Sequence, residues 1–236
     1  MNGTDVVIAR NPLYAFATAT ARPEVPMVYV MPALASREVA ANLYGAGVKA
    51  RAYRRLNVWQ YHYLERIAVQ RARWVVTFSE IRKRETVDAY RIPETRVRVI
   101  PPGIPHAEPN GRAVARRLRE DLGLPEDAKV ILTACRLVER KNVPLLIQAV
   151  ARMRSDGVYL VIAGDGPQRP ALETLVARLG LAGRVRFAGF QREMAALYAL
   201  ADVFVLPSTY EPFGFVYLEA MAAGVPCIGL RAEYPR

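Results

Sequence analysis

With 236 residues, the chain is long enough for one large or two modest domains, each with a core of its own. Its 52% hydrophobic content, its mean hydropathy of +0.05 and the lack of an uninterrupted apolar run of about 18 residues argue against a spanning helix. MNGTDVV has neither the basic nor the apolar segment of a secretion signal, and the net charge of +11 suits an anionic partner.

The two cysteines, Cys135 and Cys227, fall in predicted interior positions and form no metal-binding pattern. Unpaired, buried cysteines fit a reducing compartment. We therefore expect a cytoplasmic protein without a metal site.

Short strands and helices alternate in the first half, the pattern of a parallel sheet covered by helices. We expect strands at 5–8, 27–31, 74–78 and 96–100. A short helix should follow the first strand, and Ser79 is a plausible N-cap for the helix before the fourth. The basic segment 35–73 is expected to be mainly helical, with breaks at Gly45 and Gly47.

Basic residues gather in this half. They are Arg51, Arg54, Arg55, Arg66, Arg71, Arg73, Arg82, Lys83 and Arg84. Such a surface would attract anionic lipid headgroups, nucleic acid or a phosphorylated substrate. Only four of the 33 basic residues are lysines, so an arginine-rich composition with a solvated face explains the excess equally well. Peripheral contact with an anionic membrane stays a hypothesis, whereas no nucleic-acid partner is expected, because no recognised binding module accompanies the charge.

The segment 101–111, PPGIPHAEPNG, has four prolines and two glycines and cannot form the interior of a helix or strand. It predicts a linker, with a domain boundary between His106 and Asn110. The domains expected are 1–108 and 109–236.

The second half alternates more cleanly. Helices are expected at 112–122, 142–154, 170–179 and 191–200, and strands at 130–133, 159–163, 184–187, 203–206 and 226–230. The fold class expected for the chain is therefore α/β, with two Rossmann-like parallel-sheet domains.

Ligands of open parallel sheets bind on the loops that follow the strands. One such loop offers Arg136, which can fork two phosphate oxygens, and Lys141, which adds a point charge. Each could instead pair with Glu139 or stay solvated. A second loop has Gly164 and Gly166, which permit close approach of a ligand to the backbone or form a tight turn.

The stretch 207–224 predicts a loop and a helix that begins near Phe213 and ends at Gly224. The start of a helix offers unpaired amides and partial positive charge to a phosphate, and Gly214 would let the anion approach. Glu211 lies in the loop, and Glu219 lies roughly 9 Å along the helix axis from the helix start near Phe213, within reach of a ribose. Alternatively, the two carboxylates are an ordinary first-turn glutamate and a solvated one.

Taken together, CRLVERKN, VIAGDGPQ and PSTYEPFGFVYLEAMAAGVP resemble the nucleotide-sugar half of the family-four retaining glycosyltransferases, which have the GT-B fold. More weakly, VVTFSE and RVRVIPPGIP resemble the end of that family's N-terminal domain and its hinge. The resemblance implies that 1–108 is part of an acceptor-side domain and that 109–236 is a nucleotide-sugar-binding domain.

Its implied activity is sugar transfer with retention, from a donor of the UDP or GDP type to an acceptor hydroxyl, without a metal or other cofactor. The acceptor would be a glycan, a lipid or a small molecule. Arg136 and Lys141 would hold the diphosphate with the amides of Phe213 and Gly214. Glu219 would bind the ribose hydroxyls, and Glu211 would face the sugar near the reacting carbon.

The sequence departs from that family in several places. Cys135 replaces a glycine, Asn142 follows the lysine where glycine is common, and Met31-Pro32 stands where a histidine is frequent. By position, neither His62 nor His106 substitutes for that histidine. The family's opening strand with its glycine-rich loop and its closing helix are not found, so a fragment is expected. A truncated, non-catalytic nucleotide-sugar-binding module and a GT-B sugar epimerase remain the alternatives.

Overall fold

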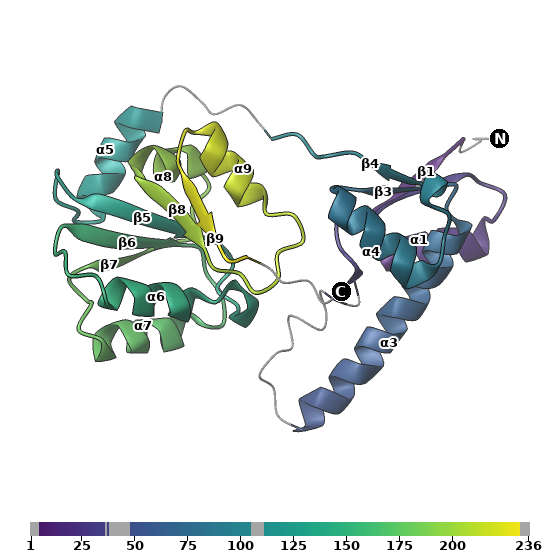
Figure 1. Ribbon diagram of the computed structural model, residues 1–236, viewed down its shortest axis with the longest axis horizontal. Coiled ribbons are helices and arrows are strands. Elements are labelled where there is room, and N and C mark those ends of the chain that lie inside the picture. The colour runs from purple at the N-terminus through teal and green to yellow at the C-terminus, as the bar shows by residue number, and fades with distance from the viewer. Residues whose placement is uncertain (1–4, 36, 38–47, 105–110, 232–236) are drawn as a thin grey trace. The chain divides into compact units, whose positions relative to one another are not determined.

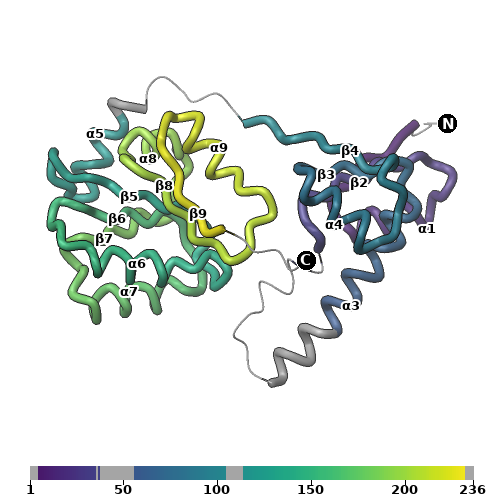
Figure 2. The backbone as a smooth tube through the Cα atoms, in the orientation of Figure 1, coloured from purple at the N-terminus to yellow at the C-terminus, as the bar shows by residue number. Residues whose placement is uncertain are grey.

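The structure is a computed structural model that describes residues 5–35, 37, 48–104 and 111–231. The chain divides into two compact units, Met1–Gly103 and Ile104–Arg236. Each unit contains a parallel sheet with helices (Figures 1 and 2), which confirms the predicted fold class. The boundary predicted between His106 and Asn110 lies outside the described residues.

Unit 1 is built on a four-stranded parallel sheet in the order β1-β2-β3-β4. The strands are β1 (Val7–Ala9), β2 (Met27–Val30), β3 (Trp74–Thr77) and β4 (Val97–Val99). The helices are α1 (Pro12–Ala21), α3 (Val48–Arg71) and α4 (Glu80–Tyr90), with a short 3₁₀ turn at Glu94–Arg96. Because each crossover leads to the next strand in the same direction, right-handed connections place these helices on one face of the sheet.

The core of unit 1 follows from this arrangement. Tyr29, Val75 and Val97 are at most 1% exposed and belong to the core beneath the helices. Ile8 points to the opposite face and is 68% exposed. Strands covered on both faces are buried throughout, whereas the side chains of β1, β2 and β4 alternate between buried and more exposed positions. In β3, by contrast, Val75, Val76 and Thr77 are all buried.

The segment expected to be helical over 35–73 contains α3, which begins at Val48, while Gly45 and Gly47 fall outside the described residues. Ala68 and Val69, near its end, are fully buried. Leu56, Trp59 and Tyr63 are 53%, 63% and 50% exposed, and the rings of Trp59 and Tyr63 stack at 5.8 Å. None of the helices within the described ranges is long and apolar enough to cross a membrane.

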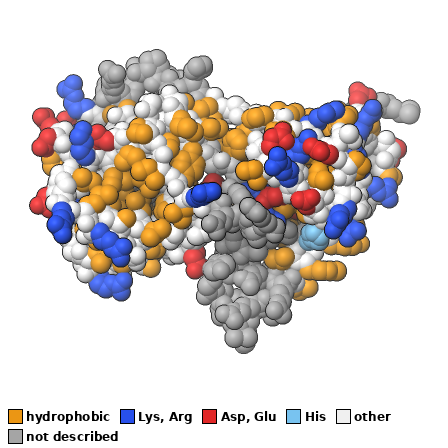
Figure 3. All heavy atoms as spheres, viewed as in Figure 1, with side chains coloured by type: hydrophobic (Ala, Val, Ile, Leu, Met, Phe, Trp, Pro, Cys, Tyr) orange, Lys and Arg blue, Asp and Glu red, His pale blue; other side chains and the backbone are white. Residues whose placement is uncertain are grey.

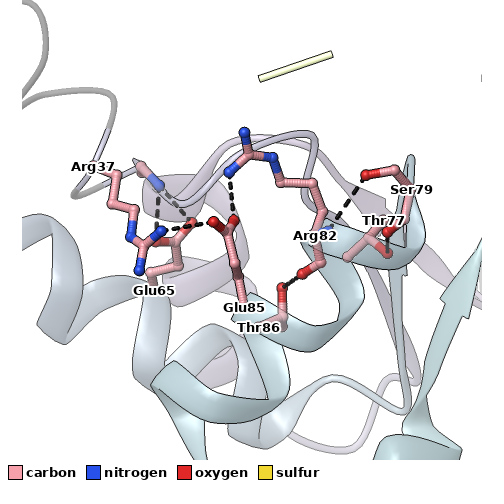
Figure 4. A network of polar contacts seen from close by, with 8 residues as sticks. Arg37, Glu65, Thr77, Ser79, Arg82, Glu85 and Thr86 are labelled. Atoms are coloured by element: carbon pink, nitrogen blue, oxygen red, sulfur yellow. Dashed lines mark hydrogen bonds and ion pairs between the residues drawn. The ribbon is translucent and has the colours of Figure 1, made fainter. Parts of the chain in front are cut away.

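The predicted cluster of exposed basic residues is partly wrong, because Arg82 is 2% exposed. Its guanidinium pairs with Glu85, which also binds Arg37 at 2.7 Å (Figure 4). The prediction for Ser79 is confirmed, since its hydroxyl accepts the Arg82 N–H at 3.3 Å and caps α4. The spacing of charged residues along α4 does not show which of its arginines points into the protein interior.

A buried carboxylate lies beside this network (Figure 4). Glu65 of α3 is fully buried and accepts the hydroxyl hydrogens of Tyr29 and Tyr90 at 3.2 and 2.6 Å. It also accepts the backbone N–H of Ala35 at 3.0 Å, in the segment that follows β2. His62 stacks on the ring of Tyr90 at 5.2 Å and so packs against one of these tyrosines.

Unit 2 has a five-stranded parallel sheet in the order β7-β6-β5-β8-β9. The strands are β5 (Lys129–Ala134), β6 (Val158–Ala163), β7 (Val185–Gly189), β8 (Val203–Leu206) and β9 (Cys227–Gly229). The helices are α5 (Gly111–Asp121), α6 (Val143–Ala151), α7 (Arg169–Arg178), α8 (Met194–Leu200) and α9 (Phe215–Ala222), with a 3₁₀ turn at Glu139–Lys141.

Helices cover both faces of this sheet (Figure 1). One core joins alternate strand residues to α6 and α7, and a second joins the others to α5, α8 and α9. The chain moves outward from β5 through β6 to β7, then returns to β8 and continues to β9 on the other side. The direction of winding therefore changes between β5 and β8, which is where ligands of such sheets bind.

Part of the arginine excess stabilises the backbone. Arg96 donates to the carbonyls of Val69, Gln70 and Ala72 at the end of α3. Arg184 binds the carbonyl of Val150 at 2.7 Å, near the end of α6, and Arg186 binds the carbonyl of Leu122 at 2.8 Å. These carbonyls lie at or after helix ends, where acceptors lack partners and cations are favourable. On the face seen in Figure 3, the basic side chains of unit 1 lie among acidic ones.

Candidate active site

The predicted site residues of unit 2 lie on three loops at the carboxyl edge of its sheet. The loops are 135–142 after β5, 164–168 after β6 and 207–214 after β8. Since β5 and β8 pair directly, the first and third loops flank the point where the winding reverses. The fold thus brings together segments more than 60 residues apart in sequence.

Hydrogen bonds fasten the loop after β5 to the loop after β8. The backbone N–H of Thr209 donates to the Arg140 carbonyl at 2.9 Å, and the Arg140 guanidinium donates to the Tyr210 carbonyl at 3.2 Å. These backbone contacts hold the neighbouring side chains, Lys141 and Glu211, in register with one another.

Lys141 and Glu211, both predicted site residues, form an ion pair across these loops. Their side chains are 9% and 21% exposed, and the Ser208 hydroxyl donates to the same carboxylate oxygen of Glu211 at 3.2 Å. A pair so shielded from water interacts more strongly than one on the surface. For Lys141, the alternative of a pair with Glu139 or a solvated side chain is therefore wrong.

Arg136 occupies a different environment. It is exposed at the start of the same loop, and its guanidinium makes no hydrogen bond or ion pair with the described part of the chain. The guanidinium's donors can therefore turn toward a ligand without breaking a contact to those residues.

The glycines of the second loop have a packing role. A Cβ atom on Gly164, whose φ is 115°, would lie 1.9 Å from the Cys135 carbonyl oxygen. A Cβ on Gly166 would lie 2.5 Å from the Leu137 carbonyl oxygen, and the Leu137 N–H donates to the Asp165 carbonyl at 2.9 Å. These glycines let the loops after β5 and β6 touch. The close approach of a ligand here stays a prediction.

The prediction that the last helix begins near Phe213 is corrected by two residues. Helix α9 begins at Phe215, and Gly214 is its N-cap with a φ of 83°. A Cβ on Gly214 would lie 2.7 Å from the Tyr217 ring and 3.2 Å from Cγ of Glu211. Phe213 precedes the helix, and its ring packs on that of Phe215 at 5.2 Å. Because Gly214 must be left-handed, the helical dihedrals start only after it.

Glu219 is the fifth of the eight residues of α9 and is half-buried. Its Oε2 accepts the hydroxyl hydrogen of Tyr198 on α8 at 2.7 Å. Burial, and then this hydrogen bond, raise the pKa of Tyr198, so the phenol keeps its proton in the physiological range. Sequence reasoning missed Tyr198, Ser208 and Arg140. Tyr198 lies 21 residues from Glu219, and no local pattern connects them.

Cys135, which directly follows β5 beside this site, should react slowly with alkylating reagents. Burial raises the pKa of its thiol to about 11, although the nearby Lys141 cation acts in the opposite direction. The thiolate reacts, so in a Cys227→Ser chain iodoacetamide labelling should increase with pH up to about 11 rather than level off near 9. Rates measured between pH 7 and pH 11.5 by mass spectrometry test this, and an inflection at or below 9 contradicts it.

Among the described residues, no group of three His, Cys, Asp or Glu side chains is arranged to hold a metal ion.

Known proteins resemble the chain along almost its whole length. A family model described as "Glycosyl transferases group 1" matches residues 114–236, and one described as "Glycosyltransferase Family 4" matches residues 2–108. The lipopolysaccharide core biosynthesis glycosyltransferase LpsE of Rhizobium meliloti (strain 1021) is 47% identical over 126 residues, which cover 53% of this chain and 36% of LpsE. The uncharacterized glycosyltransferase MJ1607 of Methanocaldococcus jannaschii is 38% identical over 173 residues, 71% of this chain and 44% of that protein.

Solved structures agree with this relationship. Anabaena Alr3699/HepE in complex with UDP has a TM-score of 0.77 at 25% identity, covering 97% of this chain and 60% of HepE. WaaG, at 24% identity and a TM-score of 0.74, shows a similar fold. The chain thus spans less than half of the curated relatives, and its two parallel-sheet domains are those expected from the GT-B fold. Since one model matches more than half of its residues and the other most of the rest, the chain belongs to the group 1 glycosyl transferases, family 4.

Proposed function

We propose that this chain carries the donor site of a retaining glycosyltransferase that transfers a sugar from a UDP- or GDP-sugar to an acceptor hydroxyl. The observation that carries the proposal is the shielded pair of Lys141 and Glu211 where the winding of the sheet reverses, next to the start of α9. Because the chain spans only part of its relatives, the activity is proposed for the whole protein.

The donor diphosphate would lie between two sources of positive charge. Lys141 and Arg136 provide cations on the loop after β5, and the amides that begin α9 provide the partial charge of a helix start. These groups stabilise the negative charge that builds on the leaving diphosphate without reorganising. Because these groups already stabilise the charge on the leaving diphosphate, the proposed reaction needs no metal or other cofactor.

The two glutamates take different parts of the donor. Glu219 accepts hydrogen bonds from the ribose hydroxyls, and Glu211 faces the transferred sugar. As the bond from the anomeric carbon to the leaving phosphate oxygen breaks, the acceptor oxygen bonds to that carbon on the same face. The leaving phosphate takes the acceptor proton, so no side-chain base is needed.

The choice of donor and acceptor classes is supported by relatives. HepE structures are described with UDP, with UDP and glucose, and with UDP-glucose. LpsE is named for lipopolysaccharide core biosynthesis, and another relative, 38% identical over 116 residues, is an N-acetyl-alpha-D-glucosaminyl L-malate synthase of Bacillus anthracis. A glycan, a lipid or a small molecule is therefore the proposed acceptor.

Calorimetric titration with UDP and GDP, followed by turnover of radiolabelled nucleotide sugar, tests the function. Binding of one nucleotide by this chain, together with sugar transfer by a full-length version, is the expected result. Binding without transfer by either version would indicate a non-catalytic module, and conversion of the sugar without transfer would indicate an epimerase. If neither nucleotide binds, the donor site is wrongly assigned.

We also propose that the protein is cytoplasmic and contacts an anionic membrane peripherally through α3. The support is the exposed Leu56, Trp59 and Tyr63 on one helix, with the exposed Arg66 and Arg71 further along it. Aromatic rings with flanking arginines suit the boundary between headgroups and acyl chains. Co-sedimentation with phosphatidylglycerol vesicles should occur at low salt and be weakened by Trp59→Ala, but not by Tyr14→Ala. Absence of sedimentation at low salt contradicts the proposal.

A further inference from the structure

The hydrogen bond between Tyr198 and Glu219 joins a buried donor to the carboxylate proposed to bind the ribose. Tyr198 is 3% exposed, and its hydroxyl donates to Oε2 of Glu219 at 2.7 Å. Rotation about the last bond of a glutamate side chain is broad, so a single strong donor decides how the carboxylate plane lies.

The tyrosine itself is held by packing. Its ring meets that of Phe204 edge-on at 6.1 Å, and Phe204, which is fully buried in β8, meets the ring of Tyr217 at 5.5 Å. Tyr217 in turn donates its hydroxyl hydrogen to the Leu206 carbonyl at 2.5 Å. Three aromatic rings from α8, β8 and α9 thus fix the direction of the Tyr198 hydroxyl.

We infer that Tyr198 is a positioning residue for the donor ribose. It holds Oε2 of Glu219, and this leaves the remaining acceptor sites of the carboxylate directed at the vicinal 2′- and 3′-hydroxyls of the nucleotide. The inference rests on the function proposed above. A site whose polar group is oriented before binding loses less freedom when the ligand arrives, so affinity for ribonucleotides should depend on this hydroxyl.

The test compares UDP with 2′,3′-dideoxy-UDP, using GDP and its dideoxy analogue if the chain binds GDP more tightly. Tyr198→Phe should weaken UDP binding about tenfold, the cost typical of a hydrogen bond to a charged group. Binding of 2′,3′-dideoxy-UDP should change less than about twofold, because that ligand has no hydroxyls for Glu219 to bind. Tyr159→Phe makes the same chemical change on β6 and should alter neither affinity.

Equal weakening of both ligands would show that Tyr198 serves stability alone, and unchanged UDP binding would show that Glu219 is oriented without it. Either result overturns the inference while leaving nucleotide binding intact. If the original chain binds neither nucleotide, the proposed function and the inference both fail.

A second variant guards against a folding defect. In the Tyr198→Phe, Glu219→Gln double variant, the side chain at position 219 that loses its hydrogen-bond donor is a neutral amide. Losing the tyrosine hydroxyl should therefore cost less folding stability than it does beside a carboxylate. Because Tyr198 acts through the carboxylate, the double variant should bind UDP as Glu219→Gln does. Weaker binding by the double variant overturns the inference.

Discussion

Replacing Lys141 with alanine is expected to weaken the binding of UDP or GDP by about 10- to 100-fold. The reason is the loss of a shielded ammonium group, whose hydrogen bonds to charged partners contribute about 1.5–3 kcal/mol. Glu211 would also lose its ion pair with Lys141 while remaining largely buried, so the negative charge of its carboxylate would repel the diphosphate. Isothermal titration calorimetry on the folded variant measures the effect.

Lys129, the first residue of the strand that leads to the Lys141 loop, offers a matched control. It also pairs with an acidic residue, Asp202, at 3.0 Å, but its side chain is 72% exposed and it begins β5, at the opposite edge of the sheet. Lys129→Ala should leave nucleotide affinity within about twofold of the original, since exposed pairs contribute little. Arg136→Ala should weaken binding as well. If neither Lys141→Ala nor Arg136→Ala changes the affinity, these residues do not bind phosphate.

The Gly164→Ala variant is expected to destabilise unit 2 by about 3 kcal/mol or more. Its Cβ would have to occupy a position 1.9 Å from the Cys135 carbonyl oxygen, in a backbone conformation with a φ of 115° that side chains rarely adopt. The carbonyl oxygen is part of the backbone, to which the Cβ is directly bonded, so no change of side-chain rotamer can relieve the contact. The melting temperature of unit 2, followed by circular dichroism, should fall by several degrees per kcal/mol.

Gly183→Ala is the control for this effect. No atom lies within 4 Å of the position of its Cβ, and its φ is outside the left-handed range. The added methyl group should leave stability unchanged or raise it slightly, because alanine restricts the unfolded chain more than glycine does. Equal melting temperatures for Gly164→Ala and Gly183→Ala would mean that the loops after β5 and β6 are not packed as described.

The sequence predicted the order of strands and helices in unit 2 well. Each helix and strand has its own spacing of apolar residues, and the loops between them contain glycine and proline. The expected strand at 203–206 is β8 without change. Errors lie at the ends, as with α9, which begins after Gly214 rather than near Phe213. There the deciding factor is a left-handed glycine whose conformation depends on the neighbouring Tyr217 ring and Glu211 side chain.

Charge was harder to interpret from the sequence. A cluster of basic residues predicted an exposed surface, yet Arg82 in that cluster is buried against Glu85. Arg96, which lies outside the cluster, caps α3. Whether an arginine faces water, a carboxylate or a helix end depends on which elements pack beside it. No spacing along one helix contains that information.

The sequence by itself determined the fold class and the candidate donor residues, because each motif consists of neighbours whose chemistry does not depend on the rest of the chain. Only the tertiary structure decided that Lys141 meets Glu211 and that Tyr198 holds Glu219. These partners lie 70 and 21 residues apart in sequence. They come together because β8 returns to pair with β5, and strand order is a property of the whole sheet.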